Sequence, residues 1–212
     1  MFPALYAILD PSLISGPLVP FAENLAAAGV ALMQLRDKRA PAGRIFAASK
    51  ELAAVLCPVG VKFIVNDRPD IAAISGASGV HVGQDDLPPE DARRIVGPAR
   101  WVGVSTHNLE QFREADATSA DYIAVGPIFP TASKENPDPV VGLALLREIR
   151  KLTTKPLVAI GGITLERAAD VFRAGADSVA VIRDLICAAD PARRAQEYLA
   201  VAAAMVPERP RV

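Results

Sequence analysis

The chain has 212 residues, of which 51% are hydrophobic and 22% are charged. This composition excludes an intrinsically disordered chain and allows a domain with a sizeable core. The formal net charge is −1, so the chain has no general attraction for nucleic acid or for an anionic membrane surface. We therefore expect neither as a partner, and any anion must be bound by local clusters of Lys, Arg and backbone N–H groups.

The ends and the cysteines bear on where the protein works. The N-terminal stretch MFPALYAILD lacks a basic segment before its apolar residues, which predicts a first strand rather than a signal peptide. No apolar run approaches the roughly 18 residues that span a bilayer. Cys57 and Cys187 form no CxxC motif, which argues against a zinc site or a disulfide scaffold. We expect both to be buried packing residues of a cytoplasmic protein.

Short apolar runs recur along the chain at fairly even intervals. They are rich in Val, Ile and Leu and are nearly continuous, which is typical of strands covered on both faces in a parallel sheet. The predicted strands are Ala4–Leu9, Ala31–Leu35, Lys62–Val65, Gly79–Val82, Trp101–Val104, Tyr122–Val125, Leu157–Ile160 and Ser178–Ile182.

Segments with helical spacing lie between these runs. Gly29, Gly76 and Gly175 follow three of them, at the point where each helix is expected to end. The predicted helices are Phe21–Ala28, Ile45–Leu56, Asp70–Ile74, Pro89–Ile95, Leu109–Thr118, Leu143–Leu152, Leu165–Ala174 and Pro191–Met205.

Eight strands alternating with eight helices predict a closed (βα)8 TIM barrel, an α/β fold in a single compact domain. An open doubly wound sheet is the structural alternative. The catalytic domain is expected to cover residues 1–206, and the polar, proline-rich residues 207–212 are expected to form a flexible tail.

One connection is unusually long. Residues 127–142 read PIFPTASKENPDPVVG, with four prolines and no helical period. After the sixth strand of a barrel, such a loop would lie over the mouth, where it predicts a lid. A stiff surface excursion is the alternative interpretation.

Polar residues follow the second strand. Alternation along a strand points Gln34, Arg36 and Lys38 to one side. Burying two cations against the helices would be costly, so the barrel mouth is their natural place. Two cations and an amide suit an anionic, planar substrate. A solvated charge cluster at a strand end would give the same pattern.

Carboxylates follow the third and fourth strands. Asp67 comes after the third, and Asp85 and Asp86 follow the fourth. Magnesium prefers hard oxygen ligands, commonly one or two carboxylates plus substrate phosphates, so Asp67 and one of the pair predict a metal site. Capping of the helices that follow is the alternative. His81 lies within an apolar strand, which favours a core histidine satisfied by its neighbours.

The residues after the fifth strand do not predict a hydrolytic site. The fifth strand ends in Ser105-Thr106-His107, with no acid partner for His107 at a readable spacing, so no hydrolytic triad is inferred. Asn108 is expected to cap the next helix.

The end of the seventh strand predicts a phosphate site. Gly161-Gly162 follows this strand, and in many barrels the loops after the last two strands bind phosphate.

Six motifs together resemble those of the thiamine-phosphate synthase family. They are QLRDK, FIVNDRPDIA, GVHVGQDDLP, VGVSTHN, YIAVGPIFPTASK and VAIGGIT, and they run in order over about residues 4–187. The resemblance implies a transferase that joins hydroxymethylpyrimidine diphosphate to a thiazole phosphate, or to its carboxylated form, with release of diphosphate. It also implies Mg²⁺ as cofactor and a pyrimidine carbocation trapped by the thiazole nitrogen.

The resemblance also implies roles for individual residues. Arg36, Lys38, Ser105 and Lys134 would be catalytic, and Asp67 and Asp86 would bind magnesium. The pyrimidine diphosphate site would comprise Gln34, Leu35, Arg36, Asp37, Lys38, Asn66, Ser105 and Lys134. The thiazole phosphate site would comprise Thr131, Ala132, Ser133, Gly162, Ile182 and Arg183.

Two positions depart from the family pattern. Ser133 replaces a threonine and keeps the hydroxyl, whereas Arg183 replaces a serine and loses it. Our hypothesis is that the Arg183 guanidinium reaches the thiazole phosphate or a nearby carboxylate; the alternative is that it points to solvent.

Three rival functions stay open at this point. They are a thiazole tautomerase on the same barrel, a catalytically silent phosphate-ligand binder, and a sugar-phosphate isomerase. The sequence retains residues that a tautomerase would not need, which speaks against that function: Gln34, Arg36, Lys38, Asp67, Asp86 and Lys134. The partners are expected to be the two small-molecule substrates, and a homo-oligomer is compatible with the sequence.

Overall fold

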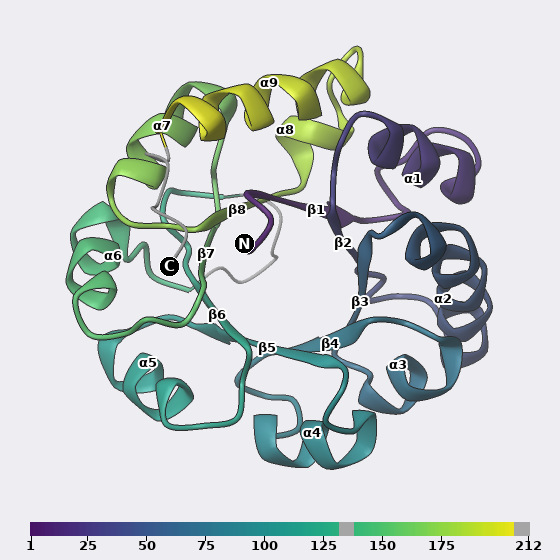
Figure 1. The fold of residues 1–212 in the computed structure, drawn as a ribbon, viewed down its shortest axis with the longest axis horizontal. Helices are drawn as coiled ribbons and strands as arrows, with labels where there is room; N and C mark the ends of the chain where they lie inside the picture. Colours follow the sequence, from purple (N-terminus) through teal and green to yellow (C-terminus); the bar gives the residue numbers. More distant parts are fainter. Residues whose placement is uncertain (132–137, 206–212) are drawn as a thin grey trace.

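The computed structural model describes residues 1–131 and 138–205. Within these residues the strands form a closed parallel barrel in which each strand pairs with its successor and β8 pairs with β1. Helices form the outer ring (Figure 1). The predicted (βα)8 barrel is confirmed, and the open doubly wound sheet is excluded because pairing between β1 and β8 leaves that sheet no edge.

The strands lie close to their predicted positions, and β4, β6 and β7 have the predicted bounds. Alternate residues face the helices and the barrel interior, which explains why both kinds of position are apolar. The strands are β1 (Leu5–Leu9), β2 (Leu32–Leu35), β3 (Lys62–Asn66), β4 (Gly79–Val82), β5 (Trp101–Thr106), β6 (Tyr122–Val125), β7 (Leu157–Ile160) and β8 (Ser178–Val181).

The predicted helices are all present, with ends shifted by a few residues. They are α1 (Leu18–Ala27), α2 (Ala42–Leu56), α3 (Pro69–Ser75), α4 (Pro89–Val96), α5 (Leu109–Asp116), α6 (Gly142–Arg150), α7 (Leu165–Arg173) and α9 (Pro191–Met205). Gly29, Gly76 and Gly175 have the positive φ expected where these helices end. The long α9 packs against both α7 and α1 and so completes the helical ring (Figure 1).

Two short helices were not predicted. They are η1 (Cys57–Val59) and α8 (Arg183–Ile186), each about one turn long. An element of this length is too short to show a helical period in sequence. The helix α8 matters for the site, because it begins directly after β8 at the mouth of the barrel.

The amino-terminal ends of the strands form the base of the barrel, where charges are paired. Asp121 precedes β6 and accepts hydrogen bonds from the Val102 amide at 2.7 Å and from Arg93. Asp177 precedes β8 and accepts from the Leu157 amide at 2.9 Å and from Arg150 at 2.7 Å. Each aspartate therefore ties an arginine of the helical ring to the edge of a neighbouring strand.

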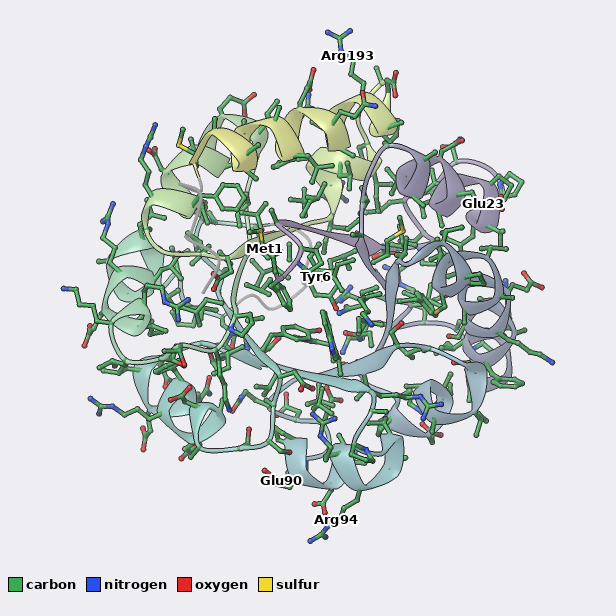
Figure 2. The ribbon with its side chains drawn as sticks, viewed as in Figure 1. Met1, Tyr6, Glu23, Glu90, Arg94 and Arg193 are labelled. Atoms are coloured by element: carbon green, nitrogen blue, oxygen red, sulfur yellow. The ribbon has the colours of Figure 1, made fainter. Side chains whose placement is uncertain are left out.

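Aromatic rings fill the interior at the base. Phe2 stacks on Trp101, with ring centroids 5.3 Å apart and an angle of 14° between the planes. The ammonium of Lys62 lies 5.4 Å from the Trp101 ring centre. Figure 2 shows Tyr6 inside the ring of strands, whereas Arg94 and Arg193 extend outward from the helices.

Two expectations about the surface need comment. Cys187 is exposed and Cys57 is half-buried, so the expectation that both are buried packing residues is wrong. Cys187 comes directly after the short helix α8 at the barrel mouth, so its side chain is not part of a helix face that packs on the core. Among the residues described, no helix is both long enough and apolar enough to cross a membrane. The predicted tail, residues 207–212, lies outside the described residues.

Candidate active site

A cavity of about 950 Å³ opens at the carboxyl ends of the strands. Residues that follow all eight strands or end them line it, as expected for the mouth of a (βα)8 barrel. Its volume is within the range of sites for small organic ligands.

The inward-facing residues of the upper barrel divide this cavity into two halves. One half is polar and the other is apolar, which suits a site that must bind two chemically different groups side by side. The strands β2 to β5 contribute Gln34, Asn66, His81 and Ser105, whereas β1, β6, β7 and β8 contribute Ile8, Ala124, Ile160 and Ile182.

The predicted cations lie together on the polar side. Gln34, Arg36 and Lys38 all line the cavity, as the alternation along β2 predicted. The Lys38 ammonium pairs with Asp67, and the Arg36 guanidinium lies 3.8 Å from the Asp10 carboxylate. The Lys38 side chain is 53% exposed, so the alternative of a solvated charge cluster at the strand end stays open.

Leu35 and Asp37, which alternate with these three residues, point away from the cavity. Leu35 is 2% exposed and packs in the core between the barrel and the helices. The Asp37 carboxylate accepts hydrogen bonds from the backbone amides of Arg39 and Ala40, each at 3.0 Å, and so shapes the turn after β2. Neither side chain lines the cavity, so their predicted part in the pyrimidine diphosphate site could only come through the backbone.

Asp67 and Asp86 lie beside each other at the mouth, after the paired strands β3 and β4. Asp67 has φ of 59°, an uncommon conformation for a residue other than glycine, and its amide donates to the His81 carbonyl at 2.8 Å. Asp86 accepts from the Gly83 amide at 2.7 Å. Burial, and then the neighbouring Asp67 carboxylate, raise the pKa of Asp86 above its ordinary value.

The helix-capping alternative for these carboxylates is wrong. The N-cap residues of α3 and α4 are Arg68 and Pro88, and neither helix has a side-chain cap. By contrast, Asn108 caps α5 as predicted, because its side chain accepts from the Gln111 amide at 2.9 Å. The left-handed backbone conformation of Asp67 and its proximity to the partly buried Asp86 carboxylate both cost folding free energy. Such features concentrate at functional sites.

The carboxylate pair fits magnesium by its chemistry. Both groups are hard oxygen donors, and a cation between them would relieve the repulsion that raises the Asp86 pKa. Among the described residues, no group of three or more His, Cys, Asp or Glu side chains gathers as a metal cage. Two carboxylates leave coordination positions free for waters and phosphate oxygens, as magnesium commonly requires.

Beneath the polar half, a chain of buried hydrogen bonds links four strands besides β2. Gln34 donates to the Tyr6 hydroxyl at 2.6 Å, which lies 3.0 Å from the Tyr122 hydroxyl. That hydroxyl lies 3.1 Å from His81 Nδ1, and His81 Nε2 lies 2.8 Å from Ser105 Oγ. His81 is therefore the satisfied buried histidine that was predicted, and it also lines the cavity.

His107 has an acid neighbour that sequence spacing did not reveal. Its Nδ1 lies 2.6 Å from the Gly126 carbonyl, and its Nε2 lies 3.5 Å from a carboxylate oxygen of Asp138. The chain returns with Asp138 after the loop that follows β6. The nearby hydrogen bond from Gln84 to the Ser105 carbonyl, at 2.7 Å, joins the loop after β4 to the end of β5.

The glycines after β7 are needed for close packing. Gly162 has φ of 62°, and a Cβ added there would lie 2.4 Å from the Pro130 carbonyl oxygen. The Arg167 guanidinium donates to the Gly162 carbonyl at 2.9 Å and lies 4.7 Å from the Phe129 ring centre. The chain after β6 therefore lies directly over the Gly161-Gly162 turn.

The remaining predicted residues lie at the apolar half or outside the described residues. Thr131, Gly162, Ile182 and Arg183 line the cavity, and Arg183 is exposed at the start of α8. Asp184 fixes α8 in place, because it accepts from Tyr198 at 2.7 Å and from Arg194 at 2.8 Å. Ala132, Ser133 and Lys134 lie outside the described residues, so their predicted roles stay predictions.

Sequence reasoning missed Tyr6, Asp138 and Arg167 as residues that line the cavity, and Tyr122 as a buried residue beneath it. The signal for the tyrosines was present. Each is a polar-tipped aromatic residue at an inward-facing position of an otherwise aliphatic strand. No comparable signal marks Asp138 and Arg167, because loop packing brings them to the cavity.

The closed barrel and the carboxylate-and-cation mouth define a (βα)8-barrel enzyme. The family model described as thiamine monophosphate synthase matches residues 5–185. A thiamine-phosphate synthase of Koribacter versatilis is 54% identical over 206 residues, covering 94% of this chain and 95% of that one. Another, of Methanoculleus marisnigri, is 44% identical over 204 residues, covering 94% and 97%.

A solved structure agrees with these sequence matches. The thiamine phosphate pyrophosphorylase of Pyrococcus furiosus superposes with a TM-score of 0.87 at 33% identity, covering 96% of this chain and 97% of that one. The chain belongs to the thiamine monophosphate synthase family, as its motifs predicted, and is a transferase of thiamine biosynthesis.

Proposed function

We propose that the protein joins hydroxymethylpyrimidine diphosphate to a thiazole phosphate, with release of diphosphate and formation of thiamine phosphate. The observation that carries the proposal is that Asp67, Asp86, Arg36 and Lys38 all line the polar half of one cavity. Membership of the family supports the same activity. The other half is apolar and is bordered by glycines, which suits a second, less charged ring with its own phosphate.

In the proposed reaction, the carbon–oxygen bond between the pyrimidine methylene group and the diphosphate breaks, and the electron pair leaves with the diphosphate. The thiazole nitrogen then supplies the pair for the new carbon–nitrogen bond. This chemistry needs stabilisation of a leaving anion more than it needs a base. A mouth with cations and carboxylates, and with no identified nucleophile among the described residues, fits that need.

Arg36 and Lys38 would bind the diphosphate oxygens, together with Asn66, Ser105 and Lys134. Mg²⁺, held by Asp67 and Asp86, would add positive charge against the departing diphosphate. Lys38 is already close to this position, since its ammonium pairs with Asp67. On substrate binding, Lys38 would exchange that carboxylate for phosphate oxygens.

The thiazole phosphate would occupy the apolar half. Its ring would lie against Ile160 and Ile182, and its phosphate near Gly162 and Arg183, with Thr131, Ala132 and Ser133 contributing from the loop after β6. Glycines and exposed backbone N–H groups at strand ends are suited to phosphate oxygens. The two substrates would then meet at the border between the halves.

Water would compete with the thiazole nitrogen for a pyrimidine carbocation. We therefore assign residues 127–142 the role of a lid that covers the mouth during the reaction. Packing of Pro130 on Gly162 supports this assignment, because one end of the loop already lies over the cavity. The cytoplasm, which offers a reducing environment for two free cysteines, is the proposed location.

The test is to mix the purified protein with both substrates and Mg²⁺ and to measure thiamine phosphate and released diphosphate. We expect equal amounts of the two products, and none when either substrate is omitted. Chelation of the metal should abolish turnover. A folded protein that binds both substrates but forms no product would contradict the proposal and favour a silent binder. Conversion of the carboxylated thiazole without coupling would favour a tautomerase.

A further inference from the structure

The hydrogen-bond chain Gln34–Tyr6–Tyr122–His81–Ser105 crosses the inside of the barrel. We call it the barrel relay. Its links measure 2.6, 3.0, 3.1 and 2.8 Å in that order. The three central members are at most 7% exposed. Both ends of the relay, Gln34 and Ser105, line the cavity where the diphosphate would bind, and Ser105 is only partly buried.

The barrel is built to hold these rings in one arrangement. Gly103 lies opposite Tyr122 in the register of β5 and β6, and a Cβ added there would lie 2.0 Å from Tyr122 Cζ. His81 stacks on Tyr122 with centroids 5.5 Å apart, and Tyr6 meets the same ring edge-on at 6.0 Å. Such close packing leaves the hydroxyl groups few alternative partners.

The direction of the relay follows from its first link. The Gln34 Nε2 group can only donate, so the Tyr6 hydroxyl accepts from it and has its own proton left for Tyr122. Tyr122 must then donate to His81 Nδ1, which leaves the imidazole proton on Nε2. That proton is donated to Ser105 Oγ, and the Ser105 proton is free to face the cavity.

The opposite direction leaves a buried group unsatisfied. If Tyr122 donated to Tyr6, the Tyr6 hydroxyl would accept twice, and its own proton would have no partner among the described residues at a position that is 1% exposed. An unmade hydrogen bond of this kind is costly. In that direction Ser105 would donate to His81 and would present only lone pairs to the cavity.

A neutral imidazole is required for the relay to work, because a charged one would donate from both nitrogens. His81 is 7% exposed, and no carboxylate among the described residues forms an ion pair with it, so its surroundings favour the uncharged imidazole. The two hydrogen bonds of the ring then decide which nitrogen carries the proton.

We propose that Tyr6, Tyr122 and His81 are positioning residues that fix the Ser105 hydroxyl as a hydrogen-bond donor to the pyrimidine diphosphate. The proposal rests on the proposed function for the identity of that substrate. It assigns a task to three buried side chains that would otherwise only fill the barrel. It also explains why the barrel carries polar aromatic residues where Phe would pack equally well.

The direct test is the tautomer of His81, observed by NMR of the protein labelled with ¹⁵N at histidine. The chain has two histidines, so a His107→Gln variant assigns the signals. We expect the His81 proton on Nε2 in the unliganded protein. A proton on Nδ1 would overturn the proposal, whatever the protein does with its substrates. This readout is thus independent of whether thiamine phosphate is formed.

A double-mutant cycle tests the link to catalysis. Tyr122→Phe removes one hydroxyl, and Ser105→Ala removes the last donor; we expect each to lower kcat/KM for the pyrimidine diphosphate by about tenfold. The double variant should be no worse than Ser105→Ala, because the relay has nothing left to orient. If kcat/KM of the double variant instead fell by the product of the two single losses, the proposal would be overturned, because Tyr122 would then act independently of Ser105.

Controls separate positioning from folding. Tyr6→Phe breaks the relay one link further away, and it replaces Tyr122→Phe in the cycle if that variant does not fold. The KM for the thiazole phosphate should be unchanged in both variants, whereas general distortion of the barrel would raise both KM values. Formation of no thiamine phosphate by the wild-type protein would defeat the proposed function and leave the tautomer measurement to decide on the relay.

Discussion

The two ends of the barrel use aspartate in opposite ways. At the base, Asp121 and Asp177 precede strands, and each accepts hydrogen bonds from an arginine and a backbone amide. At the mouth, Asp67 and Asp86 follow strands and lie beside each other; burial, and then the neighbouring Asp67 carboxylate, raise the pKa of Asp86. The base satisfies its aspartates fully within the protein, whereas at the mouth Asp67 has a half-exposed lysine as its ion-pair partner and Asp86 keeps a raised pKa.

This difference teaches that the strand end decides what a polar residue does. A residue before a strand faces the closed end of the barrel, where pairing stabilises the fold. A polar residue after a strand can face the cavity, as Asp67 and Asp86 do, where complete pairing within the protein would leave nothing to bind a substrate. The comparison predicts that substitutions at the mouth change activity and substitutions at the base change stability.

The largest effect is expected at the metal site. Asp67→Asn should lower turnover by about 100-fold or more, because the departing diphosphate loses metal stabilisation. Thiazole phosphate binding, measured by calorimetry, should survive. Asp70→Asn is the matched control, since this exposed aspartate lies on α3 and pairs with Arg68. Normal turnover in Asp67→Asn would mean that the metal assignment is wrong.

The pH dependence of the free energy of unfolding is the next largest expected effect, and it concerns His81 beneath the mouth. The His81 pKa falls from 6.5 to about 4 on folding, so the unfolded chain binds the proton more readily. The folded protein should therefore lose about 3 kcal/mol between pH 6.5 and 4 through this group. Urea unfolding of the wild type and of His81→Gln, without metal, measures the difference in slope. Equal slopes would contradict the prediction.

The matching prediction at the base concerns stability without activity. Asp121→Ala leaves the Val102 amide without its acceptor and removes the carboxylate that pairs with Arg93, so it should lower the free energy of unfolding by about 2 kcal/mol. Turnover per folded molecule should not change. Asp91→Ala, which removes an exposed ion pair with Arg94, should cost at most about 0.5 kcal/mol. Loss of turnover in Asp121→Ala would break the division between the two ends.

The smallest expected effect concerns Arg183. If its guanidinium reaches the thiazole phosphate, Arg183→Ser should raise the KM for that substrate by about fivefold and leave the KM for the pyrimidine diphosphate unchanged. Steady-state kinetics with each substrate varied in turn measures both constants. An unchanged KM for the thiazole phosphate would show that Arg183 points to solvent.

The barrel could be predicted from sequence because its strands are covered on both faces. Runs such as Tyr122–Val125 are buried at every inward and outward position, and positive-φ glycines such as Gly175 mark where helices end. The cations of the mouth were also predictable, because alternation along β2 fixes the side to which Arg36 and Lys38 point. These are local properties of a short stretch of chain.

The parts that could not be predicted depend on contacts between distant strands. The barrel relay joins Tyr6 to Tyr122 and His81 to Ser105 through the register of a closed sheet, which no single segment encodes. The neighbour of His107, Asp138, is brought to it by loop packing. The prediction that Cys187 is buried was wrong because the helix before it, α8, is only one turn long and shows no helical period in the sequence.

The most direct test of the division between mouth and base is the turnover of Asp86→Asn, measured per folded molecule. In the metal-free protein, the raised pKa means that the ionised carboxylate destabilises the fold above that pKa, so the variant should be at least as stable as the wild type. We predict that its turnover falls by about 100-fold while its free energy of unfolding stays equal or rises. Normal turnover in a destabilised Asp86→Asn would contradict the account.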